Sequence, residues 1–98
     1  MQVTVHVPAA LRQFAAGERQ VQVDVEQPTL GAVFDNLHTA CPGVTERTLD
    51  ERGFVRQHIN IFVDGELIRI HGLGLQTPVE PGSEVWILPA VSGGSGGA

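Results

Sequence analysis

The residues of this chain whose types could take part in chemistry lie at its C-terminal end, where the sequence becomes rich in glycine. After Pro89 the chain reads A-V-S-G-G-S-G-G-A to Ala98. Glycine loses more conformational freedom on ordering than any other residue, so this segment adds nothing to a core. A thread without bulky side chains can enter a narrow enzyme channel and present a carboxylate there. A disordered end or a leftover expression linker has the same composition, so the tail alone leaves both interpretations open.

Elsewhere in the chain, the side chains that usually carry catalysis or bind metals do not show the sequence spacings typical of catalytic or metal-binding sites. Cys41 is the only cysteine, which excludes an internal disulfide and an iron–sulfur site built from four thiolates. The four histidines form no HxH or HExxH pair, so we expect no metal ion and no bound cofactor. Because no cluster of residues could carry a reaction, a stand-alone enzyme is the least favoured class.

The charge of the chain bears on its partners. Its net charge is −5, and its six basic residues are scattered arginines without a single lysine. Binding to phosphate backbones depends on clustered Lys and Arg, so nucleic acid is not expected as the main partner. No apolar stretch approaches the roughly 20 residues of a membrane span, and no basic, apolar leader opens the chain. We therefore expect a cytoplasmic protein with no membrane partner.

The apolar pattern of the 98 residues predicts one domain built mostly from strands. Residues 2–7 and 20–25 alternate apolar and polar side chains with the period of a half-buried strand. The long connection between them carries Leu11 and Phe14, which we expect to fold back onto the core. Further strands are predicted at residues 58–63 and 83–88, with a short edge strand at 66–70.

One main helix is predicted to begin after Thr29, whose side chain can cap it. Pro42 and the glycine after it end this helix. The charged segment 44–57 is interpreted as a loop with room for one short helical turn, anchored by Leu49 and Phe54. Apolar residues spaced by three and four put one stripe on the helix, formed by Leu30, Val33, Phe34, Leu37 and Cys41.

The order strand, strand, helix, strand, short strand, strand predicts an α+β domain. A hairpin covered by one main helix, with further strands added, gives a mixed sheet of four to five strands with the helix packed on one face. The first and last strands can lie parallel at its centre, because the chain between them is long enough for a crossover. This is the β-grasp, or ubiquitin-like, arrangement, assigned here to residues 1–92 and followed by a flexible tail at residues 93–98.

Four segments of the chain carry a family resemblance. Residues 60–65, 77–79, 81–85 and 87–94 read N-I-F-V-D-G, T-P-V, P-G-S-E-V and I-L-P-A-V-S-G-G. In them the chain resembles the MoaD/ThiS family of ubiquitin-like sulfur carriers, most closely its CysO-like branch, and the likeness extends over nearly the whole chain up to Gly94. A lone Gly-Gly would be weak evidence in a chain with 12 glycines, but a Gly-Gly a few residues beyond the final strand of a β-grasp pattern is specific.

The resemblance implies covalent chemistry at Gly94, with Gly93 and Gly94 threaded into the channel of a partner enzyme. An ATP-dependent adenylating enzyme of the ubiquitin-activating type would activate the Gly94 carboxylate, and sulfur would then displace AMP and leave a thiocarboxylate. A sulfur-accepting synthase would use that sulfur in biosynthesis, with cysteine, molybdopterin and thiamin among the possible products. The protein would then be a cosubstrate, and a monomer that forms transient complexes.

One departure from the family pattern is that residues 95–98 (S-G-G-A) follow Gly94, which therefore has no free carboxylate in this sequence. The extension could be a precursor segment that a protease removes, a cloning scar, or the mark of an inactive relative. If only Ala98 is trimmed, Gly97 becomes the end. An extended chain spans about 17 Å from Pro89 to Gly94 and about 27 Å to Gly97, so a channel built for the shorter thread favours Gly94.

The last strand supplies the candidate surface for docking the activating enzyme. Val85 and Ile87 are assigned to the helix-covered core, so Trp86 and Leu88 point to the open face of the sheet. The alternative, in which Trp86 is core and the register is reversed, stays open. Aromatic residues are enriched in interface hot spots, and the predicted partner-binding residues are Trp86, Leu88, Pro89, Val91 and Phe62.

Two other functions compete with sulfur carriage. A ubiquitin-like protein modifier would be joined through Gly94 to a lysine of another protein, since both functions begin with activation of the same acyl group. The other is a plain β-grasp interaction domain whose tail is inert. High-mass conjugates would support the modifier and a free thiocarboxylate the carrier, whereas a silent deletion from Gly93 onward would favour the interaction domain.

Overall fold

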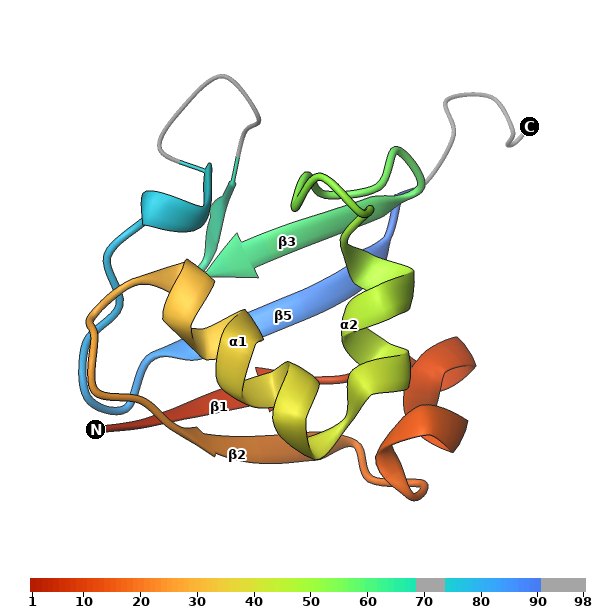
Figure 1. Ribbon diagram of the computed structural model, residues 1–98, viewed down its shortest axis with the longest axis horizontal. Helices are drawn as coiled ribbons and strands as arrows, with labels where there is room; N and C mark the ends of the chain where they lie inside the picture. Colours follow the sequence, from red (N-terminus) through yellow and green to blue (C-terminus); the bar gives the residue numbers. More distant parts are fainter. Residues whose placement is uncertain (69–73, 91–98) are drawn as a thin grey trace.

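The computed structural model describes residues 1–68 and 74–90, which form a five-stranded mixed sheet with helices on one face (Figure 1). The strand order is β2-β1-β5-β3-β4. The central strands β1 and β5 run parallel, and the other neighbouring pairs are antiparallel. This confirms the predicted α+β, ubiquitin-like β-grasp arrangement. The strands are β1 Gln2–His6, β2 Gln20–Asp24, β3 Ile59–Val63, β4 Glu66–Leu67 and β5 Glu84–Pro89.

The helix α1, Leu30–Ala40, packs across the sheet as predicted. Its first turn is capped by Thr29, whose hydroxyl accepts a hydrogen bond from the Ala32 N–H at 3.2 Å. The apolar stripe faces the sheet and forms the centre of the core. The stripe residues Leu30, Val33, Phe34 and Leu37 are each at most 2% exposed, and the main sheet residues beneath them are Val3, Val5, Ile61, Val85 and Ile87.

The segment after α1 differs from the predicted loop, because a second helix, α2, spans Pro42–Thr48. Pro42 begins this helix, where a proline lacks only a donor that would be unpaired anyway. The helical stripe was hidden because two of its three buried members, Thr45 and Thr48, count as polar in an apolar pattern. The Thr48 hydroxyl donates to the Val44 carbonyl at 2.8 Å, so its burial leaves no polar group unpaired.

The connection between β1 and β2 contains a 3₁₀ helix, η1 (Ala9–Ala15), that packs against α2. Leu11 is buried and Phe14 partly buried, as expected. Gly43 allows the two helices to approach, because a Cβ there would lie 2.9 Å from the Cβ of Phe14. Arg47 of α2 covers the same Phe14 ring, with its guanidinium carbon 3.7 Å from the ring centroid.

The structure also bears on the predicted core anchors, the predicted edge strand and the expected absence of a membrane span. Leu49 packs against the core, but Phe54 is 50% exposed, so its assignment as a core anchor is wrong. The edge strand β4 is shorter than predicted, and Arg69 and Ile70 of the predicted range lie outside the described residues. Within the part of the chain that the structure describes, no helix is long and apolar enough to cross a bilayer.

Candidate functional site

The alternation of β5 places its side chains on two opposite faces of the sheet. Val85 and Ile87 are completely buried beneath the helices, whereas Trp86 and Leu88 are 41% and 37% exposed on the face without helices. The predicted register of this strand is therefore confirmed, and the reversed one is excluded. As a result, the open face displays large apolar side chains shortly before the glycine-rich tail begins.

Trp86 is the centre of an aromatic cluster that crosses the three inner strands. Phe62 of β3 is its direct partner in the antiparallel register, and His6 of β1 is its partner in the parallel register. The imidazole of His6 stacks on the Trp86 ring, with 3.6 Å between ring centroids and 4° between planes. We call His6, Phe62 and Trp86 the aromatic cluster. His6 was not among the predicted site residues, because only the pairing of β1 with β5 brings it to Trp86.

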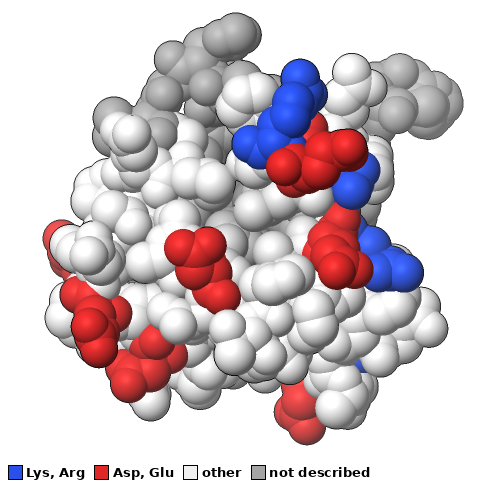
Figure 2. Space-filling view, in the orientation of Figure 1, with Lys and Arg blue, Asp and Glu red and all other residues white. Residues whose placement is uncertain are grey.

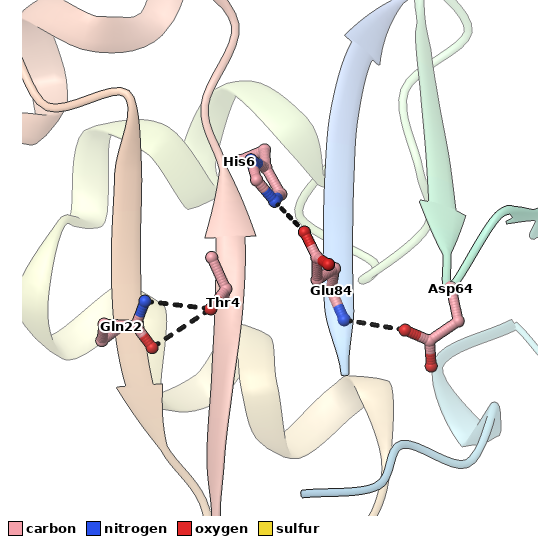
Figure 3. A network of polar contacts seen from close by, with 5 residues as sticks. All are labelled: Thr4, His6, Gln22, Asp64 and Glu84. Carbon is pink, nitrogen blue, oxygen red and sulfur yellow. Dashed lines mark hydrogen bonds and ion pairs between the residues drawn. The ribbon is translucent and has the colours of Figure 1, made fainter. Parts of the chain in front are cut away.

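Polar contacts lie along the same strands, and one of them involves His6 of the aromatic cluster (Figure 3). The Nε2 atom of His6 lies 2.7 Å from Oε1 of Glu84, and the Glu84 backbone N–H donates to Oδ1 of Asp64 at 2.8 Å. The other Asp64 oxygen accepts a hydrogen bond from the Ser83 hydroxyl at 2.7 Å. Thr4 and Gln22 exchange hydrogen bonds on the neighbouring strands. The start of β5 is thus fixed to the β3–β4 turn, and the His6 imidazole that stacks on Trp86 is itself tied to Glu84.

A groove of about 300 Å³ lies beside the aromatic cluster at the end of β5. It carries two cationic side chains, Arg12 and Arg19, and none of the described residues that line it is acidic. Arg12 is oriented by the hydrogen bond from its Nε to the Val7 carbonyl at 3.0 Å. The groove therefore combines an apolar wall with positive charge, which suits a protein partner with acidic side chains. Its apolar wall is formed by the side chains of Trp86, Leu88 and Pro8.

The described chain ends just where the predicted chemistry begins. Pro89 is exposed, and the Ala90 N–H donates to the His58 carbonyl at 2.9 Å, so the backbone is held up to this point. Val91, Gly93 and Gly94 lie outside the described residues, so their predicted roles stay predictions. Among the residues that are described, no group of three His, Cys, Asp or Glu side chains could hold a metal ion.

Comparison with known proteins places this chain in a family. The ThiS family model matches residues 5–94. The sulfur carrier protein CysO of Mycobacterium tuberculosis is 40% identical over 96 residues, which cover 96% of this chain and all of the relative. The structure of this chain superposes on the crystal structure of M. tuberculosis CysO with a TM-score of 0.79. The two chains are 38% identical, and the match covers 91% of this chain and 99% of the CysO chain.

Two further relatives broaden this picture. In the BexX/CysO complex of Amycolatopsis orientalis, the matching chain is 34% identical with a TM-score of 0.78, covering 94% of this chain and 99% of that one. Small archaeal modifier protein 1 of Haloferax volcanii is 38% identical over 80 residues, covering 81% of this chain and 86% of the relative. The family model and the relatives span the sheet, the helices and the chain up to Gly94, and this protein therefore belongs to the ThiS family.

Proposed function

We propose that this protein is a sulfur carrier whose working end is Gly94, used after residues 95–98 are removed. The observation that carries the proposal is the extent of the family match, which ends at Gly94 and leaves out the last four residues. The relatives named sulfur carrier proteins support the class of function. The exposed side chains of Trp86 and Leu88 next to the tail support the need for a partner, because a carrier must dock on the enzyme that charges it.

The proposed chemistry changes one atom at the end of the chain. A carboxylate is a poor acyl donor, so the partner first joins the Gly94 carboxylate to AMP from ATP and releases pyrophosphate. A hydrosulfide ion then attacks the acyl carbon, the bond to AMP breaks, and the chain ends in a thiocarboxylate. Because glycine has no Cβ, nothing blocks this attack or the entry of Gly93 and Gly94 into a channel. The catalytic groups belong to the adenylating enzyme, and this protein is its cosubstrate.

The open face supplies the docking surface in this proposal. The aromatic cluster and Leu88 would pack against the activating enzyme, with Pro89 and Val91 guiding the tail toward its channel. Arg12 and Arg19 in the adjoining groove would pair with acidic side chains at the edge of that contact. A protease that removes residues 95–98 and a synthase that accepts the sulfur complete the system.

Mass spectrometry tests the proposal directly. A chain that ends at Gly94 is incubated with the activating enzyme, ATP and sulfide, and its intact mass is expected to rise by the difference between sulfur and oxygen. Chains that end at Gly93 or Ala98 serve as controls and are expected to stay unchanged. No rise for the Gly94 chain, with an enzyme shown to charge another carrier, would overturn the proposal.

A protein modifier is the second candidate, and the match to small archaeal modifier protein 1 favours it. In that function the activated Gly94 would be attacked by a lysine amine of a target protein, and the same docking surface would serve the first step. Antibody detection of this chain in cell extracts separates the two. Covalent conjugates of high mass support the modifier, whereas a free chain that ends in a thiocarboxylate supports the carrier.

A further inference from the structure

His6 is a titratable side chain at the centre of the open face, and the proposed function uses its ring but not its charge. It lies on β1 between its register partners, Gln20 of β2 and Trp86 of β5. Although no helix covers this face, His6 is only 9% exposed, since the Trp86 ring covers one side of its imidazole. Histidine is the side chain whose charge ordinarily changes between about pH 5 and 8. A charge that can be switched is therefore in contact with the main predicted docking residue.

Two contacts of His6 become stronger when its imidazole is protonated. Nε2 lies 2.7 Å from Oε1 of Glu84, and a hydrogen bond between charged groups is about twice as strong as a neutral one (Figure 3). The stack, with 4° between planes, places the imidazolium charge against the face of the Trp86 ring, whose electrons attract a cation. A neutral ring with its hydrogen on Nε2 makes the same contacts, so the proton changes their strength more than their geometry.

Charged groups face His6 from several elements. Glu84 of β5 contributes its carboxylate, and Asp64 of the β3–β4 turn accepts a hydrogen bond from the Glu84 backbone. Arg12 of η1 and Arg19, which precedes β2, line the same groove as His6. When His6 is neutral, the charge of Glu84 opposes the two arginines. When His6 is protonated, it offsets Glu84, and the local charge of this part of the open face rises by one.

The groove beside Trp86 differs in charge from the helix side of the sheet. In the view of the helix side, arginines lie among acidic side chains at one end, and acidic side chains alone occupy the other (Figure 2). The groove contains Arg12 and Arg19, but no acidic side chain is present among the described residues that line it. Acidic groups of a partner are therefore attracted to the groove, and an added positive charge nearby strengthens the attraction.

We propose that His6 is a positioning residue of the docking surface whose effect depends on its proton, an inference that rests on the proposed function. Protonated His6 holds Trp86 more firmly and makes the surface more attractive to a partner with acidic side chains, which in the proposed function is the activating enzyme. Neutral His6 leaves the Glu84 carboxylate to weaken that attraction. A unit charge about 4 Å from an opposite one changes an affinity by about fivefold even at the permittivity of water. Docking therefore tightens as the pH falls through the range in which histidine titrates.

The fluorescence of Trp86 tests this inference in the free protein, because the chain has one tryptophan and no tyrosine. A protonated imidazole in contact with an indole quenches its emission, so the emission should fall as the pH is lowered from about 8 to about 5. Iodide is an anionic quencher and reports the charge around the ring. Its quenching constant, divided by that of neutral acrylamide, should rise about twofold over the same range.

Two histidine variants provide the matched comparison. His6→Gln keeps a hydrogen-bonding side chain that does not titrate, and it should abolish both fluorescence changes. His38→Gln removes an exposed histidine on α1, and it should leave both changes as in the wild type. Emission and iodide quenching that follow pH equally in the wild type and in His6→Gln would overturn the proposal.

Calorimetry with the activating enzyme extends the test to docking. The dissociation constant of the wild type should be about fivefold lower at about pH 6 than at about pH 8, after division by the same ratio for His6→Gln, which removes titration of the enzyme itself. His6→Phe keeps an aromatic stack without a charge and should show no such dependence. A wild-type affinity that follows pH no more than that of the variants would also overturn the proposal. Failure of the proposed function is seen separately, because a chain ending at Gly94 would then gain no sulfur in its intact mass.

Discussion

Both faces of β5 carry apolar side chains, but the two sets lie in opposite environments. Val85 and Ile87 are completely buried under the helices, while their neighbours Trp86 and Leu88 keep about two-fifths of their surface in water. Burial of a large apolar side chain contributes roughly 1.5–3 kcal/mol, so the covered face supplies stability. The open face leaves part of its apolar area in water, and in the proposed function this area is the docking surface. The alternation of residues along one strand therefore separates the side chains of the core from those proposed to bind the partner.

Replacement of Ile87 by alanine should produce the largest loss of stability among the variants of the two faces. The side chain of Ile87 is completely buried, so the change leaves a cavity, and we expect a loss of about 3 kcal/mol in the free energy of unfolding. Leu88→Ala, one residue further along the same strand, should cost less than about 1 kcal/mol because its side chain is already solvated. Urea unfolding of both variants measures the difference. Equal losses would show that the open face is also structural.

Replacement of Trp86 by alanine should separate docking from stability. The variant loses the stack on His6, which contributes about 1 kcal/mol to folding. Its affinity for the activating enzyme should fall more, by about thirtyfold or roughly 2 kcal/mol, as for a central hot spot. Calorimetry of binding and thermal unfolding give the two numbers. A large loss of stability with unchanged affinity would assign Trp86 to the fold and not to the docking surface.

Replacement of Gly43 by alanine tests how the covered face is built. The new Cβ would lie 2.8 to 3.0 Å from three atoms of Phe14, so η1 and α2 must move apart, at a cost of about 1.5 kcal/mol. The same change in a Phe14→Ala background should cost much less, because the clashing atoms are gone. Chemical unfolding of the four chains completes the cycle. An identical cost in both backgrounds would mean that the close approach is not the cause.

The smallest expected effect concerns Asp50 and the acid stability of the hairpin at residues 49–55, which the β-bridge between Leu49 and Val55 closes. The pKa of Asp50 is lowered, mainly by the Phe54 N–H, so the folded form binds its proton less readily than the unfolded chain. The resulting stability is present above the unfolded pKa, about 3.9, and is lost as pH falls through the lower folded value. Asp50→Asn should therefore lower the melting temperature at pH 7, and its difference from the wild type should narrow below about pH 4. A constant difference across this range would contradict the assignment.

Features that depend on neighbouring residues were predictable from the sequence. The alternation of Val3 and Val5 in β1, and of Val85 and Ile87 in β5, fixed which side chains are buried. Thr29 predicted the start of α1 because its hydroxyl has only to reach an N–H three residues ahead. In both cases the residues that carry the pattern lie within a few positions of one another, in or next to a single strand or helix.

Features that depend on contacts between distant segments were not predictable in the same way. α2 was missed because its buried threonines are polar by type, and the burial of Thr48 becomes acceptable only through its hydrogen bond to the Val44 carbonyl. An aromatic residue among charged ones suggests a side chain that packs into the core. Phe54 does not do so, because the hairpin formed around Asp50 leaves its side chain half exposed.

The sequence by itself determined the β-grasp pattern, the two faces of β5 and the resemblance to the ThiS family. All three depend on the spacing of neighbouring apolar residues or on short motifs, which can be recognised without the fold. The tertiary structure alone decided that His6 stacks on Trp86 and that Phe54 is exposed. The physical reason is that these placements come from a parallel strand pairing and from hydrogen bonds across turns, which join residues that no periodicity in the chain connects.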